Sequence, residues 1–264
     1  MSPALSELPL LALAFSGLLI GSFLNVVVHR VPAGVSLLSP GSACPSCGHA
    51  VRPYDNIPVL SWLLLGGRCR DCETSIYWRY PAVEAVTGLL FLAAGLRFGW
   101  SSYLPAVMVL AAAGVALFVI DLAHRRLPFA ITGFTAVAML LALGFDAAMG
   151  GGGEVLPALL STALWLAVYG GAWLVTGGRG MGLGDVALAP VLGLTLGWLG
   201  WGPSLVGLLG GFAIGAIVGV GLLALGRSGR RSQVPHGPFM LLAAALGLFA
   251  GQPIWAFYLR LVGL

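Results

Sequence analysis

The segment Leu8–Val28 reads LPLLALAFSGLLIGSFLNVVV, an apolar run without a charge that is long enough to cross a bilayer as a helix. No positive cluster precedes it and no A-x-A site follows it, so we interpret it as a retained helix. The rest of the chain is similar, because 59% of its 264 residues are hydrophobic and only 8% are charged. Water-soluble chains carry about 25% charged residues. We therefore predict an integral membrane protein.

Glycine-rich and charged turns divide the chain into about eight predicted transmembrane helices. Their approximate ranges are 8–28, 82–98, 103–121, 130–148, 155–175, 185–200, 204–225 and 238–260. The fold class predicted from these ranges is an all-α membrane protein.

The positions of the arginines predict the orientation of these helices. All 13 basic residues are arginine, and most lie in short segments between apolar runs. With the N-terminus outside, every arginine except Arg97 and Arg260 falls on the cytoplasmic side, as the positive-inside rule requires. The net charge of +4 is thus a signal of topology, and we expect no nucleic-acid partner.

All four cysteines lie in one polar segment, as the pairs Cys44/Cys47 and Cys69/Cys72. Two C-x-x-C pairs about twenty residues apart have the spacing of a tetrahedral four-cysteine zinc site. So small a polar module has little core of its own, and a structural zinc ion would hold it folded. Two disulfides or a redox motif are the alternatives, and a cytoplasmic position argues against disulfides.

These observations divide the chain into three predicted parts. Residues 1–28 form the first transmembrane helix, residues 29–81 form a small cytoplasmic zinc-binding module, and residues 82–264 form a seven-helix membrane domain.

Two acidic residues are predicted to lie at the same depth in the membrane. Asp121 ends one apolar run and Asp185 begins another, and the predicted topology puts both at cytoplasmic helix ends. Two carboxylates in a partly dry site can share one proton and act as general base and general acid, which is the chemistry of aspartic peptidases. Gly182 and Gly184 would let an extended substrate approach the backbone beside Asp185.

Other interpretations of these acids remain open at this point. Each could cap a helix or pair with a nearby arginine, and this is as well supported by the residues as catalysis. A proton-coupled transporter could use the same acids as a relay, although relays tend to lie at the midplane and in repeated halves. A non-catalytic assembly protein would bind partners through the zinc module. Asp146, near an external helix end, is expected to be solvated, and Glu84 is expected to favour the N-terminus of its helix.

Further short motifs follow one another along nearly the whole chain. They are Gly21-Ser-Phe-Leu-Asn-Val26 with Arg30 and Pro32, both cysteine pairs, Asn56-Ile-Pro-Val-Leu-Ser-Trp62, Gly67-Arg-Cys-Arg-x-Cys72, Arg79-Tyr-Pro-x-Val-Glu84, Ile120-Asp121 with Leu127-Pro128, Met181-Gly-Leu-Gly-Asp185-Val186, and Pro235-x-Gly-Pro-Phe239. In this order and at these distances, the chain resembles the type IV prepilin peptidases, bifunctional bacterial membrane enzymes of the GxGD aspartic peptidase class.

The resemblance implies that Asp121 and Asp185 are the catalytic pair. It implies that the substrates are precursors of type IV pilins or of pseudopilins of secretion systems, whose basic leader is cut at the cytoplasmic face of the bacterial inner membrane. It also implies a second activity in many members, in which S-adenosylmethionine methylates the new N-terminus. In the family this activity is associated with the N-terminal cytoplasmic part.

Two positions depart from the family pattern. Members commonly carry a basic residue two positions after the GxGD aspartate, where this chain has Ala187, and many carry an acid where it has Phe129. The missing base is expected to change the ionisation of Asp185 or the handling of substrate. Phe129 leaves Asp121 as the only acid of its loop.

Overall fold

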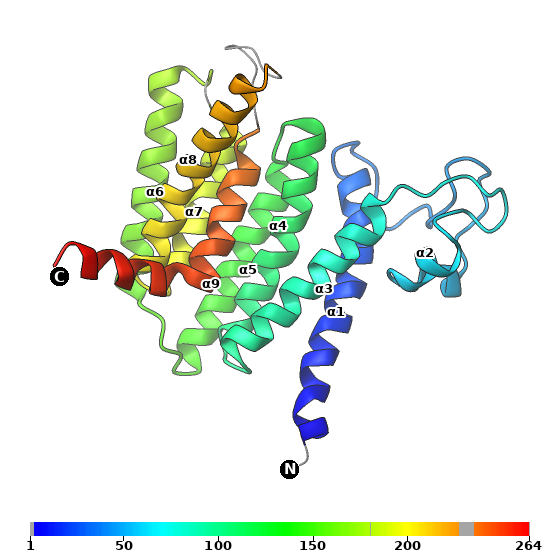
Figure 1. Cartoon of the computed structure of the whole chain (residues 1–264), viewed down its shortest axis with the longest axis horizontal. Coiled ribbons are helices and arrows are strands. Elements are labelled where there is room, and N and C mark those ends of the chain that lie inside the picture. The colour runs from blue at the N-terminus through cyan, green and yellow to red at the C-terminus, as the bar shows by residue number, and fades with distance from the viewer. Residues whose placement is uncertain (1–2, 180, 227–234, 264) are drawn as a thin grey trace. The chain divides into compact units, whose positions relative to one another are not determined.

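A computed structural model describes residues 3–179, 181–226 and 235–263. Within these residues the chain forms nine α-helices and one short 3-10 helix, as expected for an all-α protein (Figure 1). It divides into two compact units, Met1–Ala116 and Leu117–Leu264, and α4 (Leu104–His124) runs from the first into the second.

The first unit is built on the close packing of α1 (Pro3–Arg30) against α3 (Arg79–Phe98). A β-carbon on Gly17 would lie 2.8 Å from the Cα of Gly88, and one on Gly21 would lie 2.6 Å from the Cα of Glu84. Only glycine permits two backbones to approach this closely, as is usual where membrane helices pack. Between these helices in sequence lie η1 (Pro53–Asn56), α2 (Leu60–Leu64) and the cysteine-bearing loops.

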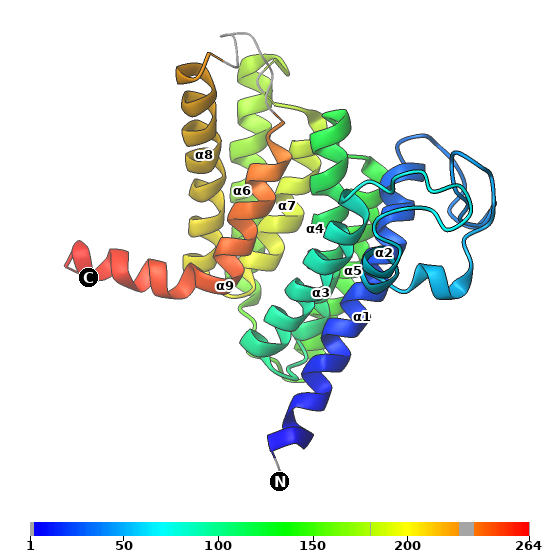
Figure 2. The ribbon, with the colours of Figure 1, turned by 45° about the vertical axis from the view of Figure 1, so that its right-hand side comes forward.

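The second unit is a bundle around α7 (Leu183–Gly197), as Figures 1 and 2 show. This helix contacts α5 (Phe129–Ala148), α6 (Val155–Thr176), α8 (Trp201–Ala224) and α9 (Gly237–Leu261). Leu188, Leu192 and Leu196 of α7 are completely buried. The middle and end of α7 therefore form the core of the second unit.

Among the described residues, seven helices are long and apolar enough to cross a membrane, and they correspond to seven of the eight predicted spans. The remaining predicted span, 185–200, corresponds to α7, which is apolar but has only 15 residues. A helix of that length is about 22 Å long, less than the about 30 Å of a bilayer core. The chain is thus a multi-pass membrane protein whose central helix is shorter than the bilayer is thick.

Candidate functional site

The two predicted catalytic acids lie close together inside the second unit. Asp121 is in the last turns of α4 and Asp185 is in the first turn of α7. Only 4% of Asp121 and 8% of Asp185 is exposed. Asp121 is near enough to Asp185 for the two carboxylates to interact electrostatically. The structure therefore brings together two acids that are far apart in sequence.

Leu127 connects the segments that carry these acids. It follows Asp121 in the loop after α4, and its backbone and β-carbon fit against Gly184, where an added β-carbon would lie 2.8 Å from Cβ of Leu127. The side chain of Leu127 also lies against Gly237, at 3.1 Å from the position of an added β-carbon. A single buried leucine thus contacts the first turn of each of two helices, α7 and α9, at points where only glycine fits.

Each acid accepts a hydrogen bond from the backbone amide of a glycine. Gly182 donates to Oδ2 of Asp185 over 2.9 Å, and Gly237 donates to Asp121. Gly182 precedes α7 and Gly237 begins α9, so both carboxylates lie near helix N-termini, where the helix dipole favours negative charge. Asp185 does cap its helix, and the cap uses only one of its oxygens. Capping and catalysis are therefore compatible at Asp185.

An aromatic cluster adjoins the acids, and sequence reasoning did not assign it to the site. Tyr169 of α6 is completely buried and interacts electrostatically with Asp185. Its hydroxyl oxygen lies 3.4 Å from Nε2 of His236. Phe212 of α8 stacks on Tyr169. His236 immediately precedes Gly237, the glycine that contacts Asp121. The motif around Gly237 was the only sequence signal for this cluster.

The four cysteines form a second candidate site, in the first unit. The Sγ atoms of Cys44, Cys47, Cys69 and Cys72 all lie within 4.8 Å of one another. The Sγ atoms of Cys44 and Cys72 are 3.7 Å apart, close to the about 3.8 Å edge of a tetrahedron with 2.3 Å zinc–sulfur bonds. A disulfide would require about 2.05 Å, and all four cysteines are free. The geometry fits a metal ion held by four thiolates.

The two cysteine pairs adopt the same backbone conformation. In the first, the amide of Cys44 donates to the carbonyl of His49 and that of Gly48 donates to Cys44, both over 2.9 Å. In the second, Cys69 donates to Thr74 and Glu73 donates to Cys69, over 2.9 and 3.0 Å. Gly48 and Glu73, at matching positions, both have positive φ. Each pair therefore lies in a tight turn of the same form, here called a knuckle, which could supply two thiolates to one metal ion.

The thiols differ in their readiness to ionise. A hydrogen bond with the Thr74 hydroxyl lowers the pKa of Cys72 to about 6, and backbone amides lower the pKa of Cys44. A backbone bond at His49 lowers the pKa of Cys47, but desolvation and the neighbouring thiols together raise it to about 12. Four thiolates this close repel one another, and a divalent cation is what would allow all four to ionise.

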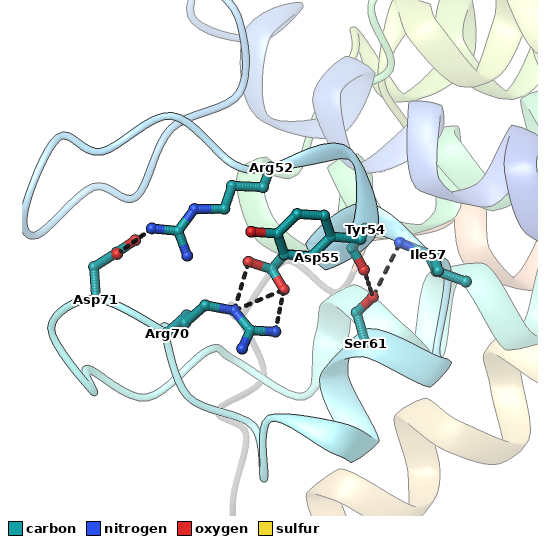
Figure 3. A network of polar contacts seen from close by, with 7 residues as sticks. All are labelled: Arg52, Tyr54, Asp55, Ile57, Ser61, Arg70 and Asp71. Carbon is teal, nitrogen blue, oxygen red and sulfur yellow. Dashed lines mark hydrogen bonds and ion pairs between the residues drawn. The ribbon is translucent and has the colours of Figure 1, made fainter.

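Two ion pairs join the second knuckle to the segment Arg52–Asp55 (Figure 3). Arg70 contacts Asp55 through Nε and Nη2, at 2.6 to 3.1 Å, and its guanidinium lies 5.5 Å from the centre of the Tyr54 ring. Asp71 accepts a 2.8 Å hydrogen bond from Arg52. The Arg70 guanidinium holds the pKa of Asp55 below its usual value, so the pair stays charged at neutral pH. The intervening residues of the C-R-D-C motif thus stabilise the module.

Two acids occupy environments that differ from those expected. Glu84 lies in the second turn of α3, not at its N-terminus, and its Oε2 accepts a 2.7 Å hydrogen bond from the amide of Val59. Asp146 is buried, with 3% of its surface exposed, and accepts a 2.8 Å hydrogen bond from Trp198. The expectation of a solvated Asp146 was wrong, because the end of α7 folds over the end of α5.

Two protein families match this chain. Residues 15–98 match the Bacterial Peptidase A24 N-terminal domain, and residues 108–220 match the Type IV leader peptidase family. The first match contains the cysteine module and the second contains both buried acids. The chain therefore belongs to the type IV leader peptidase family.

Individual relatives extend this match to nearly the full chain. A prepilin leader peptidase/N-methyltransferase of Pseudomonas aeruginosa is 37% identical and covers 94% of this chain and 92% of its own. A protein of the same name from Aeromonas hydrophila is 36% identical, and the match covers 92% of this chain and 91% of the relative's chain. Another from Myxococcus xanthus is 43% identical, and the match covers 82% of this chain and 64% of the relative's chain. No solved structure matches significantly.

Proposed function

We propose that this protein is a membrane-embedded aspartic endopeptidase that removes the leader peptide of type IV prepilin or pseudopilin precursors. The observation that carries the proposal is the buried pair of carboxylates, Asp121 and Asp185, held by glycine amides at two helix N-termini. Family membership and the names of the relatives support the same activity.

The chemistry requires the two acids to share one proton. The ionised carboxylate takes a proton from a water molecule as that water attacks the scissile carbonyl carbon. The protonated carboxyl donates a hydrogen bond to the carbonyl oxygen, and a proton then passes to the departing amine. Because the two carboxylates lie close enough to interact, the protonation of the dyad is described for the pair and not for either residue alone.

Gly182 and Gly184 serve this reaction in different ways. Gly182 is exposed and its backbone is extended, with φ −80° and ψ 153°, so an extended substrate can approach the main chain there. Gly184 faces inward against Leu127 and sets the position of Asp185. We propose that this loop receives the residues beside the cleavage site.

In the cysteine module, Cys44, Cys47, Cys69 and Cys72 hold a structural zinc ion, which supplies folding energy and takes no part in peptide cleavage. The relatives' names also include N-methyltransferase. We infer that this chain transfers a methyl group from S-adenosylmethionine to the new N-terminus, in the part formed by residues 29–81.

The arginine distribution supports the orientation in the membrane. The N-terminus lies outside, and the zinc module and the aspartates face the cytoplasm of a bacterial inner membrane. Arg227, Arg230 and Arg231, which contribute to this bias, lie outside the described residues. The division at residues 28 and 81 into first helix, module and seven-helix membrane domain remains part of the proposal. No feature of the described residues favours a transporter.

Cleavage of a pilin-like precursor by the purified protein in detergent tests the peptidase function. Asp121→Asn and Asp185→Asn should each abolish cleavage. Asp146→Asn is the matched control, because it alters a buried acid beside Trp198 at the other end of the bundle and its amide oxygen can still accept the Trp198 hydrogen bond. Cleavage that is absent in the parent, or that survives both substitutions, would overturn the proposal.

Methyl transfer is tested separately. The parent and Asp185→Asn are incubated with an already cleaved pilin and S-adenosylmethionine that carries a labelled methyl group. Label should appear at the N-terminus with both proteins, since methylation does not use the dyad. Absence of label with both would remove the second activity and leave the first intact.

A further inference from the structure

The short helix α2 presents leucines outward, although it is not a membrane-spanning helix. Leu60, Leu63 and Leu64 are 49%, 61% and 78% exposed, and Ile57 just before the helix is 43% exposed. Leu60, Leu63 and Leu64 fall on one face of α2 because they are three or four residues apart, and Ile57 adds an exposed apolar side chain just before the helix. In water, this contiguous apolar face would be unfavourable.

The opposite face of α2 is fixed by polar contacts to the rest of the unit. Ser61 donates to the carbonyl of Tyr54 and accepts from the amide of Ile57, over 2.9 and 3.0 Å (Figure 3). The indole of Trp62 donates to the carbonyl of Ile76 over 3.1 Å. These contacts leave α2 little freedom to rotate. The outward direction of its leucines is therefore built into the fold.

A hydrogen bond from the residue before α2 to α3 fixes the position of α2 along α3. The amide of Val59, directly before α2, donates to Oε2 of Glu84, which lies five residues into α3. At 1.5 Å per residue, Glu84 is about 7 Å along the helix from its start at Arg79. Val59 adopts a φ of 62°, which is strained for a β-branched residue, so the chain bends sharply to make this contact. Both views place α2 alongside α1 and α3 and not beyond their ends (Figures 1 and 2).

The start of α3 has the composition of a membrane–water interface. Tyr77, Trp78 and Tyr80 are 59%, 62% and 38% exposed, and the Arg79 guanidinium lies 5.9 Å from the ring centres of both tyrosines. Exposed tryptophan and tyrosine gather at the headgroup level of bilayers. With α3 entering the membrane there, a point one or two turns further along lies at the upper acyl chains.

We propose that the outward face of α2, formed by Ile57, Leu60, Leu63 and Leu64, is embedded among the lipid acyl chains of the leaflet that borders the cysteine module. The partner is lipid because the hydrogen bond from Val59 to Glu84 holds this face alongside α3, beyond the exposed aromatic residues at the start of that apolar helix. In this arrangement α2 is an interfacial helix. It anchors the module beside the membrane, so that the metal knuckles stay at the surface and do not swing freely on their loops.

Photolabelling of the unmodified protein tests this placement. The protein is reconstituted in nanodiscs of phosphatidylcholine and phosphatidylglycerol, with a fraction of the phosphatidylcholine carrying a diazirine on its acyl chain. After illumination, mass spectrometry locates the lipid adducts. We expect adducts on residues 57–64 at a level comparable with α1 and α3, and at least about fivefold fewer on the exposed knuckle residues 45–50.

Two outcomes would overturn the proposal. In one, α1 and α3 are labelled but residues 57–64 carry no more adducts than residues 45–50, which places α2 in water. In the other, labelling of residues 57–64 falls steeply as the protein-to-lipid ratio rises while labelling of α1 stays constant, which assigns the face to a second copy of the chain. Neither outcome depends on peptidase activity, so the result is independent of the proposed function.

Discussion

Gly237 lies so close to Asp121 that a β-carbon on Gly237 would be 2.7 Å from Oδ2 of that carboxylate. The amide of the same glycine donates a hydrogen bond to Asp121. The start of α9 therefore holds one acid of the dyad by a contact that no other residue type permits.

Replacing Gly237 by alanine should displace Asp121 and lower kcat for precursor cleavage by about tenfold or more, because small misplacements of reacting groups are costly. The matched control is Gly219→Ala on α8, where an added β-carbon meets no atom within 4 Å. Cleavage rates of both purified variants, with their thermal unfolding midpoints, check this. Equal rates for Gly237→Ala and the parent would show that the contact has no role.

The two glycines before Asp185 should respond differently to alanine. A β-carbon on Gly184 would lie 2.8 Å from Cβ of Leu127 and 3.1 Å from its carbonyl oxygen, and neither atom can move freely. On Gly182 it would lie 3.4 Å from Asp185, an ordinary contact. Gly184→Ala should therefore lower the unfolding midpoint and activity, whereas Gly182→Ala should leave the midpoint unchanged.

Kinetics separate the roles of these glycines further. If Gly182 borders the substrate, Gly182→Ala should raise KM more than it lowers kcat, because it obstructs binding and leaves the dyad in place. An unchanged KM with a strongly reduced kcat would instead assign Gly182 to the positioning of Asp185.

The cysteine module should bind one metal ion per chain. Elemental analysis of the purified protein should find one equivalent of zinc, and Cys44→Ser and Cys69→Ser should each lose it, because each knuckle supplies half of the ligands. Ser46→Ala, an exposed residue between two ligands, is the control. Retention of full zinc content in both cysteine variants would contradict the four-thiolate site.

The second knuckle should also depend on Arg70. Arg70→Lys keeps the charge but loses the paired contacts to Asp55, since lysine lacks the planar fork of arginine. Transfer of zinc to a chromogenic chelator should become faster by about two- to fivefold, and the difference should shrink at high salt because the pair is partly exposed. Identical transfer rates at low salt would show that the pair does not support the knuckle.

At the end of the bundle away from the dyad, Trp198→Phe should cost about 1–3 kcal/mol of stability. The substitution removes the indole donor from Asp146 while the carboxylate stays buried. Unfolding in mixed detergent measures the loss, and peptide cleavage by the folded fraction should be unchanged. A stability equal to that of the parent would mean that the hydrogen bond contributes no net energy.

Much of the fold could be predicted from particular residues. The apolar run from Leu8 to Val28, bounded by His29 and Arg30, lies within α1, and seven of the predicted spans correspond to helices of sufficient length. Such runs can be recognised in the sequence because a helix that crosses a bilayer must be long and apolar whatever tertiary contacts it makes. The cysteine spacing likewise predicted the four-cysteine cluster, because both knuckles are short local structures.

Side-chain environments were less predictable. Asp146 appeared exposed from its place near a helix end, but Trp198, distant in sequence, covers it. Glu84 appeared to be a helix N-terminal residue, but α3 begins five residues earlier and Glu84 binds the amide of Val59. Tyr169 and His236 gave no pattern of their own. In each case the partner comes from another element, and local sequence carries no information about it.

For this protein, the sequence by itself determined the membrane class, the number of apolar segments, the cysteine pairs and the two candidate acids. These follow from local composition and spacing, because the bilayer thickness sets the length of an apolar helix and metal coordination sets the spacing of the cysteines. Only the tertiary structure decided that Asp121 and Asp185 share one buried site, since this depends on Leu127 packing against Gly184 and Gly237. Contacts between segments so far apart are set by how helices pack in three dimensions, and by no periodicity along the chain.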